Sequence, residues 1–125
     1  MLIEVATDKA PAAIGPYSQA IIAGDYMFAS GQIPIDPESG SIKGENITEQ
    51  TEQVMKNIGA ILAEADMDFT KVVKTTCFLA DMADFAAFNA VYEKYFIDKP
   101  ARSCVAVKEL PKNVLCEVEV IVYLK

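Results

Sequence analysis

Apolar residues recur along this chain with two different periods, which predict a mixture of strands and helices. Residues 2–6 predict a short strand. Residues 20–23 and 26–30 are apolar runs separated by Gly24-Asp25, a pair typical of a tight hairpin turn. A polar connection with several prolines follows, so the N-terminal third is expected to be strands and loops.

Two later segments carry apolar residues at helical spacing. Asn46, followed by Glu49 three residues later, resembles a capping box and predicts a helix that continues to about residue 66. Asp81 and Asp84 open a second predicted helix. This helix carries an aromatic stripe, which we interpret as core packing and not as a cofactor contact. The stripe consists of Phe85, Phe88, Tyr92, Tyr95 and Phe96.

Three further strands are predicted, at residues 72–80, 102–108 and 115–124. The first is apolar on both faces. Val73, Cys77 and Leu79 are expected to point one way, and Val72 and Phe78 the other. Two helices can cover only one side of a sheet of this size, so its other side needs a cover. Self-association supplies that cover most simply, and we therefore expect a homo-oligomer.

Composition restricts the classes of function. The 125 residues suit one domain, and 52% of them are hydrophobic, which is rich for a small monomer. The net charge of −7 makes nucleic acid an improbable partner. The chain has no histidine, which excludes Ser-His-Asp and Cys-His catalysis and histidine-ligated metals.

The cysteines and the N-terminus indicate a location. The three cysteines, Cys77, Cys104 and Cys116, show no zinc or CxxC spacing, and we expect free thiols in a reducing compartment. The N-terminus does not resemble a signal peptide, and no apolar run is long enough to cross a bilayer. We therefore expect a soluble, cytoplasmic protein without membrane contact.

Two charged residues interrupt the apolar runs near the C-terminus, Arg102 and Glu117. Charged residues seldom occupy buried strand positions unless they are paired or bind a ligand. An arginine fork matches a carboxylate through two hydrogen bonds, and a half-buried glutamate suits proton transfer. The pair indicates either a pocket for an anion or a structural salt bridge between two strands. Taken alone, the residues favour the salt bridge, because ion pairs outnumber active sites.

Several short motifs, in a fixed order, make the chain recognisable. They are Ala12-Ala-Ile-Gly-Pro-Tyr-Ser-Gln19, Ser30-Gly-Gln-Ile-Pro34, Gln50-Thr-Glu-Gln-Val-Met-Lys-Asn-Ile58, Val73-Lys-Thr-Thr76, Asn89-Ala-Val-Tyr92, Pro100-Ala-Arg-Ser-Cys-Val105 and Leu110-Pro111 leading into Glu117. Over nearly its full length the chain resembles the RidA/YjgF family of enamine/imine deaminases. The resemblance implies an α+β, chorismate-mutase-like fold, in which a mixed β-sheet carries two α-helices on one face. It also implies a homotrimer with a central β-barrel and a cleft at each subunit interface.

The resemblance also assigns roles. Arg102 matches the arginine that binds the substrate carboxylate, and Glu117 matches the acid that activates the hydrolytic water. Cys104 matches a cysteine beside the reacting carbon, which acts by placement and main-chain contact. The remaining substrate-binding residues match positions that line the pocket. These are Tyr17, Ser30, Gly31 and Asn89.

The implied substrate is 2-aminoacrylate or a related imine, and the implied products are a 2-keto acid and ammonia. No metal or organic cofactor is expected. Alternatives from other classes are a non-enzymatic 2-keto acid-binding module, an RNA-directed ribonuclease or translation inhibitor, and a redox-activated holdase. The chain departs from the family in one place: only residues 97–99 separate Phe96 from Pro100, which puts the preferred substrate size in question.

Overall fold

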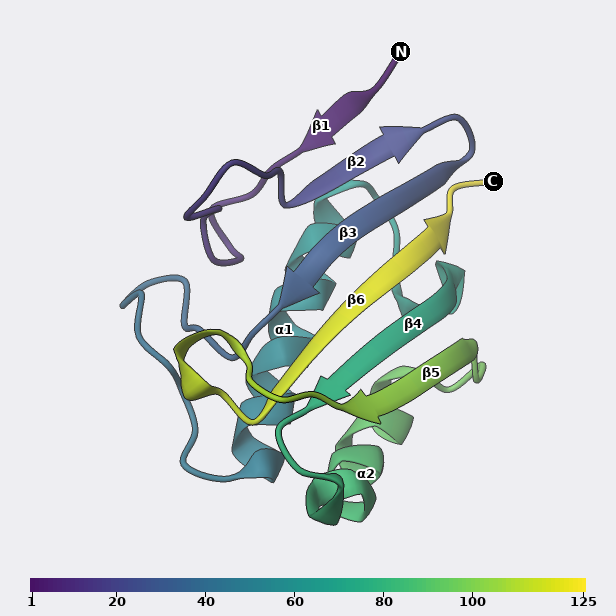
Figure 1. Ribbon diagram of the computed structural model, residues 1–125. Coiled ribbons are helices and arrows are strands. Elements are labelled where there is room, and N and C mark those ends of the chain that lie inside the picture. Colours follow the sequence, from purple (N-terminus) through teal and green to yellow (C-terminus); the bar gives the residue numbers. More distant parts are fainter.

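The protein folds into one six-stranded mixed sheet with two long helices, as the computed structural model of residues 1–125 shows (Figure 1). The helices are α1 (Ile47–Glu64) and α2 (Phe85–Tyr95). The strands are β1 (Ile3–Val5), β2 (Ala20–Ala23), β3 (Tyr26–Gln32), β4 (Val72–Leu79), β5 (Ala101–Ala106) and β6 (Cys116–Tyr123). The predicted α+β class is confirmed.

The strand order is β1-β2-β3-β6-β4-β5, so β6, the last strand, lies in the middle of the sheet. All neighbouring strands are antiparallel except β4 and β5, which run parallel and are joined through α2. A parallel pair needs such a crossover, and the helix that makes it packs on the sheet. Strand β5 is therefore an edge strand that lies beside α2.

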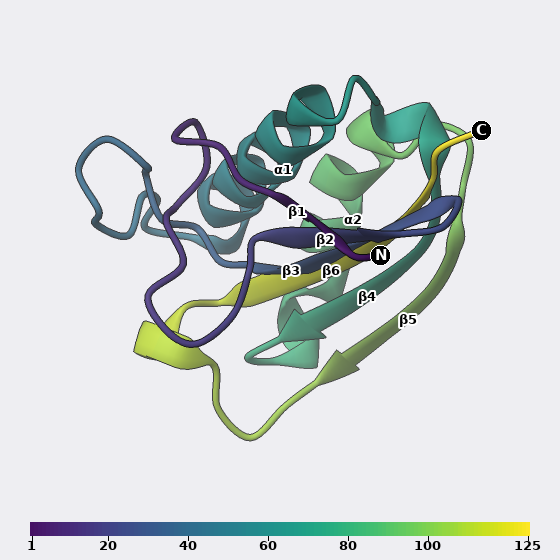
Figure 2. The same cartoon turned by 90° about the horizontal axis from the view of Figure 1, so that it is seen from above.

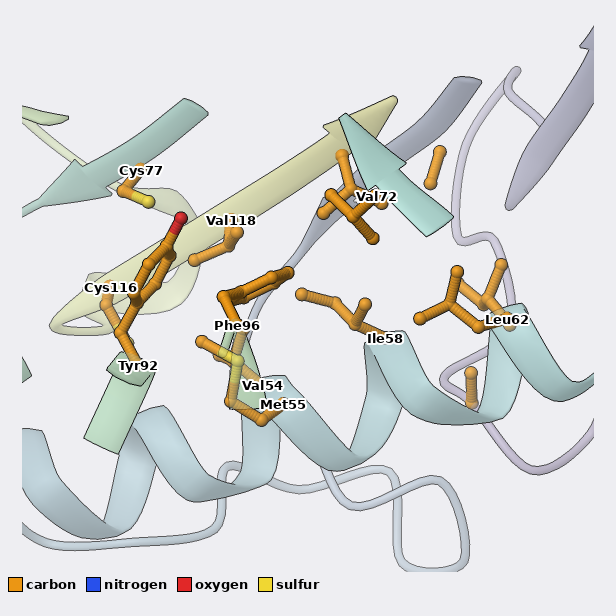
Figure 3. Close-up of a cluster of buried hydrophobic side chains, with 14 of the residues drawn as sticks. Val54, Met55, Ile58, Leu62, Val72, Cys77, Tyr92, Phe96, Cys116 and Val118 are labelled. Atoms are coloured by element: carbon orange, nitrogen blue, oxygen red, sulfur yellow. The ribbon is translucent and has the colours of Figure 1, made fainter. Parts of the chain in front are cut away.

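Both helices lie on the same side of the sheet (Figure 2). Between them and the sheet lies a core of 22 buried residues, part of which Figure 3 shows. The aromatic stripe of α2 belongs to this layer: Phe88 and Phe96 are almost fully buried, and Tyr92 is buried with its hydroxyl 2.8 Å from Thr75 Oγ1. The prediction of core packing for the stripe is confirmed.

Local sequence signals explain the element boundaries. At the start of α1, Asn46 Oδ1 accepts a hydrogen bond from the Glu49 backbone N–H at 2.9 Å, as the capping pattern predicts. Between β2 and β3, Ala23 pairs with Tyr26, so Gly24-Asp25 forms a two-residue turn. Gly24 adopts φ +61°, which a glycine tolerates without steric cost.

The prediction for the two faces of β4 is wrong at two residues, Val72 and Val73, which were expected on each other's faces. Val73 is 42% exposed, whereas Val72 is buried on the helix-covered face together with Cys77 and Leu79. The cause is a register shift against β6: Val72 pairs with Val122 and Lys74 pairs with Ile121. One extra residue in β4 reverses the alternation, as in a β-bulge, and turns Val73 away from the core.

The face of the sheet opposite the helices carries several large apolar side chains that are 40% or more exposed. They are Tyr26, Phe28, Val73 and Tyr123. Single exposed apolar residues are ordinary, but a group on one sheet face is typical of an interface. No helix of the protein combines the length and apolar character that a membrane span requires.

Candidate functional site

Arg102 projects from the edge strand β5 toward α2. Its Nη1 donates a hydrogen bond of 2.7 Å to Asn89 Oδ1, and the guanidinium carbon lies 4.8 Å from the centroid of the Tyr92 ring and 5.5 Å from that of Phe85. Aromatic faces hold a guanidinium in place without neutralising its charge. The arginine is therefore fixed in orientation and keeps its remaining N–H donors for another group.

No carboxylate of the chain pairs with Arg102. The two ion pairs of the structure join Lys94 to Glu52 and Lys125 to Asp25. The interpretation of Arg102 and Glu117 as a structural salt bridge is therefore wrong, because neither residue takes part in an ion pair. Arg102 is also the only arginine in the sequence.

Cys104 lies on the same face of β5 as Arg102, two residues further along. It pairs in register with Cys77 of β4, and it packs against the core. Burial raises the pKa of the Cys104 thiol, while Arg102 and a hydrogen bond with Cys77 lower it by less. Burial raises the pKa of Cys77 to about 12. Both side chains are therefore neutral thiols near pH 7 and poor nucleophiles.

Glu117 lies near the start of β6, on the face that the helices leave open, opposite Phe78 of β4. It is half-buried, and burial together with the nearby charge of Glu119 raises the pKa of its carboxyl above the ordinary value. Gly31 lies against it: a Cβ at residue 31 would lie only 2.0 Å from a Glu117 carboxylate oxygen. A carboxyl with a raised pKa can exchange protons closer to neutral pH than an ordinary glutamate.

Tyr17 and Ser30 belong to the same part of the molecule as Gly31. Ser30 Oγ donates a 2.6 Å hydrogen bond to the Ser18 carbonyl, which ties β3 to the loop before β2. Tyr17 is 49% exposed on that loop, and it lines a cavity of about 190 Å³ together with Gly31. The sequence-predicted residues thus gather around the end of β3 and the start of β6. They are Tyr17, Ser30, Gly31 and Glu117.

The structure therefore divides the candidate residues into two groups on opposite faces of one sheet. Arg102 pairs with Thr75 of β4, which pairs with Val120 of β6, and the latter two are buried under the helices. Paired residues of neighbouring strands point to the same face. Glu117 lies three residues before Val120, and alternation places it on the other face. Within one chain, a small molecule cannot contact both the Arg102 guanidinium and the Glu117 carboxylate.

Sequence reasoning missed three contributors to these groups. Tyr92 and Phe85 flank the guanidinium, yet the sequence indicates only that both belong to the aromatic stripe and that Tyr92 ends the motif Asn89–Tyr92. Gln19, 5% exposed, holds the loop that carries Tyr17 through hydrogen bonds to the main chain of residues 7–11. Gln19 ends one of the motifs that carry the family resemblance, but nothing in the sequence indicates that its side chain is buried. No group of three or more His, Cys, Asp or Glu side chains is arranged to hold a metal ion.

Comparisons with known proteins agree with this fold. Residues 7–124 match the model of a family described as Endoribonuclease L-PSP. A Lactococcus lactis protein is 59% identical over 97% of each chain, and its name is that of a regulator, AldR. Reactive Intermediate Deaminase A of Arabidopsis thaliana, a chloroplast protein, is 51% identical over 94% of this chain and 63% of its own. The crystal structure of E. coli TdcF with bound serine is 38% identical, with a TM-score of 0.92 over 97% of this chain and 98% of TdcF.

Proposed function

Because the chain belongs to the RidA/YjgF family, we propose that it hydrolyses reactive enamine and imine intermediates to 2-keto acids and ammonia. The proposed substrates are 2-aminoacrylate with its tautomer 2-iminopropanoate, and 2-iminobutanoate. The observation that carries this proposal is Arg102, a cation oriented by Asn89 and two aromatic rings that has no carboxylate partner in its own chain. The deaminase name of the Arabidopsis relative supports the same reaction.

In this proposal Arg102 binds the substrate carboxylate through two parallel N–H···O bonds. Glu117 accepts a proton from a water molecule as the water oxygen attacks the imine carbon and the C=N electron pair moves to nitrogen. The amino group of this adduct is then protonated and leaves as the C=O bond forms. One imine and one water give one 2-keto acid and one ammonia, so atoms and electrons balance. Cys104 contributes by position and main-chain contact, and the proposed reaction needs no cofactor.

We further propose that two copies of the chain complete each site. The carboxylate and the imine carbon of the substrate are directly bonded, yet Arg102 and Glu117 face opposite sides of the sheet. A substrate held by both residues must therefore lie between copies, with Arg102, Asn89 and Cys104 from one and Tyr17, Ser30, Gly31 and Glu117 from another. The exposed apolar residues of the open sheet face support self-association through that face. The homotrimer around a central barrel is the arrangement that the family resemblance implies.

A second candidate is a module that binds 2-keto acids without catalysis, through the same Arg102 contact. The regulator name of the Lactococcus relative favours it. It predicts saturable binding of pyruvate or 2-oxobutanoate and no accelerated release of ammonia. Ribonuclease activity, which the family description names, is disfavoured by the net charge of −7, because it repels the phosphate backbone on average.

The test is the release of ammonia and 2-keto acid from 2-aminoacrylate, generated in place by a serine dehydratase. We expect the chain to accelerate this release and the Arg102→Ala variant to lose the acceleration while it keeps its fold. Keto-acid binding without acceleration would support the binding module. Acceleration that persists in Arg102→Ala would contradict the proposed role of Arg102.

A further inference from the structure

The cavity beside Tyr17 and Gly31 has mostly apolar walls and lies within a single chain. Its volume is about 190 Å³. Its apolar side is formed by Pro11, Ala12, Ile14, Ile33, Ile35 and Pro37. Lys112 is the one charged residue that lines it, and this lysine is exposed, so its ammonium can remain in water.

We propose that this cavity receives the side chain of the substrate and selects 2-imino acids with a branched aliphatic or aromatic side chain. The proposal rests on the deaminase function proposed above and names the substrate class of that site. An engineered apolar cavity of about 150 Å³ is known to bind benzene. A cavity of about 190 Å³ therefore has room for an isobutyl or a benzyl group.

Gly31 borders both the cavity and the proposed catalytic carboxylate. Gly31 lines the cavity, and the space that its missing Cβ would fill is taken by the Glu117 side chain. The imine carbon carries three substituents: the nitrogen, the carboxylate and the side chain. With the carboxylate held by Arg102 of another copy and the water held by Glu117, the cavity lies where the side chain can extend.

Hydrogen bonds from two buried amide side chains, Gln19 and Asn57, fix the cavity walls before any ligand arrives. The Gln19 side-chain amide donates to the Pro11 carbonyl at 2.7 Å, and its oxygen accepts from the Thr7 N–H at 2.7 Å. On the opposite wall, Asn57 Nδ2 donates to the carbonyls of Ile33 and Ile35 at 3.1 and 3.0 Å. A preformed apolar site binds an apolar group without a further ordering cost.

The wall chemistry also predicts what the cavity rejects. Its one cation, Lys112, is exposed, so the second carboxylate of an imine derived from aspartate or glutamate would lose its hydration against the apolar wall without a buried partner. A methyl side chain would leave most of the cavity unfilled. We therefore expect the specificity constant kcat/KM to be at least about tenfold higher for the leucine-derived imine than for the alanine-derived imine.

The experiment compares imines generated by an L-amino acid oxidase from alanine, leucine, phenylalanine and glutamate, with the remaining imine trapped by semicarbazide. Ala12→Phe places a ring in the cavity, and Ala13→Phe is the matched control, since Ala13 is an exposed neighbour that does not line it. We expect the leucine-to-alanine ratio of kcat/KM to fall about tenfold or more in Ala12→Phe and to stay at the parent value in Ala13→Phe.

A parent ratio near one, or an equal change in both variants, would overturn the proposal. If the parent consumes no imine at all, the deaminase function fails, and the cavity is then tested by calorimetry with 4-methyl-2-oxopentanoate and pyruvate. Tighter binding of the larger keto acid in the parent, lost in Ala12→Phe alone, would support the side-chain cavity. Equal binding of the two keto acids would refute it.

Discussion

The Glu117 carboxylate fills the space beside Gly31 that any other residue would need for its side chain. A Cβ at residue 31 would lie 2.0 Å from a carboxylate oxygen and 2.8 Å from the carboxyl carbon of Glu117. The obstacle is the end of a side chain, so Gly31→Ala can be accommodated by rotation of Glu117. The glycine is thus required for the position of the carboxylate more than for the backbone.

Gly31→Ala is therefore expected to fold and to lose activity. We expect kcat/KM for imine hydrolysis to fall at least about tenfold, because Glu117 must leave its position, with a destabilisation of about 1–2 kcal/mol. The measurements are imine turnover and thermal unfolding. Gly59→Ala is the control, as its nearest contact is Phe69 at 3.4 Å. Full activity in Gly31→Ala would show that the observed position of Glu117 is not needed.

Arg102 offers a chemical test, because it is the only arginine in the sequence. An arginine-selective dicarbonyl reagent should modify the chain once, abolish turnover, and be slowed by pyruvate, which occupies the same guanidinium. Mass spectrometry counts the adducts, and turnover is followed in parallel. Modification without loss of turnover would remove Arg102 from the mechanism.

Arg102→Lys should lose nearly as much turnover as Arg102→Ala, at least about a hundredfold, since an ammonium cannot present a planar fork to a carboxylate. Steady-state kinetics of the two variants make the comparison, and circular dichroism verifies that each is folded. Near-normal turnover in the lysine variant would mean that positive charge alone suffices.

The raised pKa of Glu117 predicts the pH dependence of activity. Burial is the main cause and the charge of Glu119 adds to it. If ionised Glu117 is the base, the acidic limb of kcat/KM lies above the ordinary glutamate pKa of about 4.3. Removing the neighbouring charge in Glu119→Gln should move that limb to lower pH. If the acidic limb stays at the same pH in Glu119→Gln, a group other than Glu117 is responsible for it.

The same pKa shift has a consequence for stability. When the pKa of a carboxyl is higher in the folded than in the unfolded chain, its protonation stabilises the fold. The full contribution is present at pH values below the pKa of the unfolded chain. This contribution is lost as the pH rises through the pKa that the carboxyl has in the folded chain. Chemical denaturation at a series of pH values should show this decline in the parent, and Glu117→Gln should reduce it.

Cys104 is expected to act by its position and not as a nucleophile, because burial raises the pKa of its thiol. Cys104→Ala keeps the main chain of β5 and should retain at least about a tenth of the parent kcat. Alkylation by iodoacetamide at pH 7 should be slow. A loss beyond about a hundredfold in Cys104→Ala, with the fold intact, would indicate a chemical role for the sulfur.

Much of this fold follows from local patterns. The capping residue Asn46 and the Gly24-Asp25 turn each have a local cause, and the structure has both. The face of Val73 could not be predicted, since the extra residue in β4 becomes visible only against its partner β6. Local patterns thus predict elements well and the pairing between strands poorly.

The separation of Arg102 from Glu117 also depends on long-range order. Both residues interrupt apolar runs, and nothing nearby in the sequence shows that β4 lies between their two strands. The rings of Tyr92 and Phe85 beside the guanidinium likewise result from the packing of α2 on the sheet edge. The sequence indicates which residues carry the chemistry, while their distribution over two faces is a property of the folded chain.

The central claim is that Arg102 of one copy and Glu117 of another act on the same substrate, and complementation between variants tests it most directly. Arg102→Ala and Glu117→Gln, each inactive alone, are co-expressed and purified as mixed oligomers. With random assembly, about a quarter of the sites receive both intact residues, so we predict about a quarter of the parent turnover. Turnover no higher than that of either variant alone, in oligomers shown to contain both chains, would contradict the account.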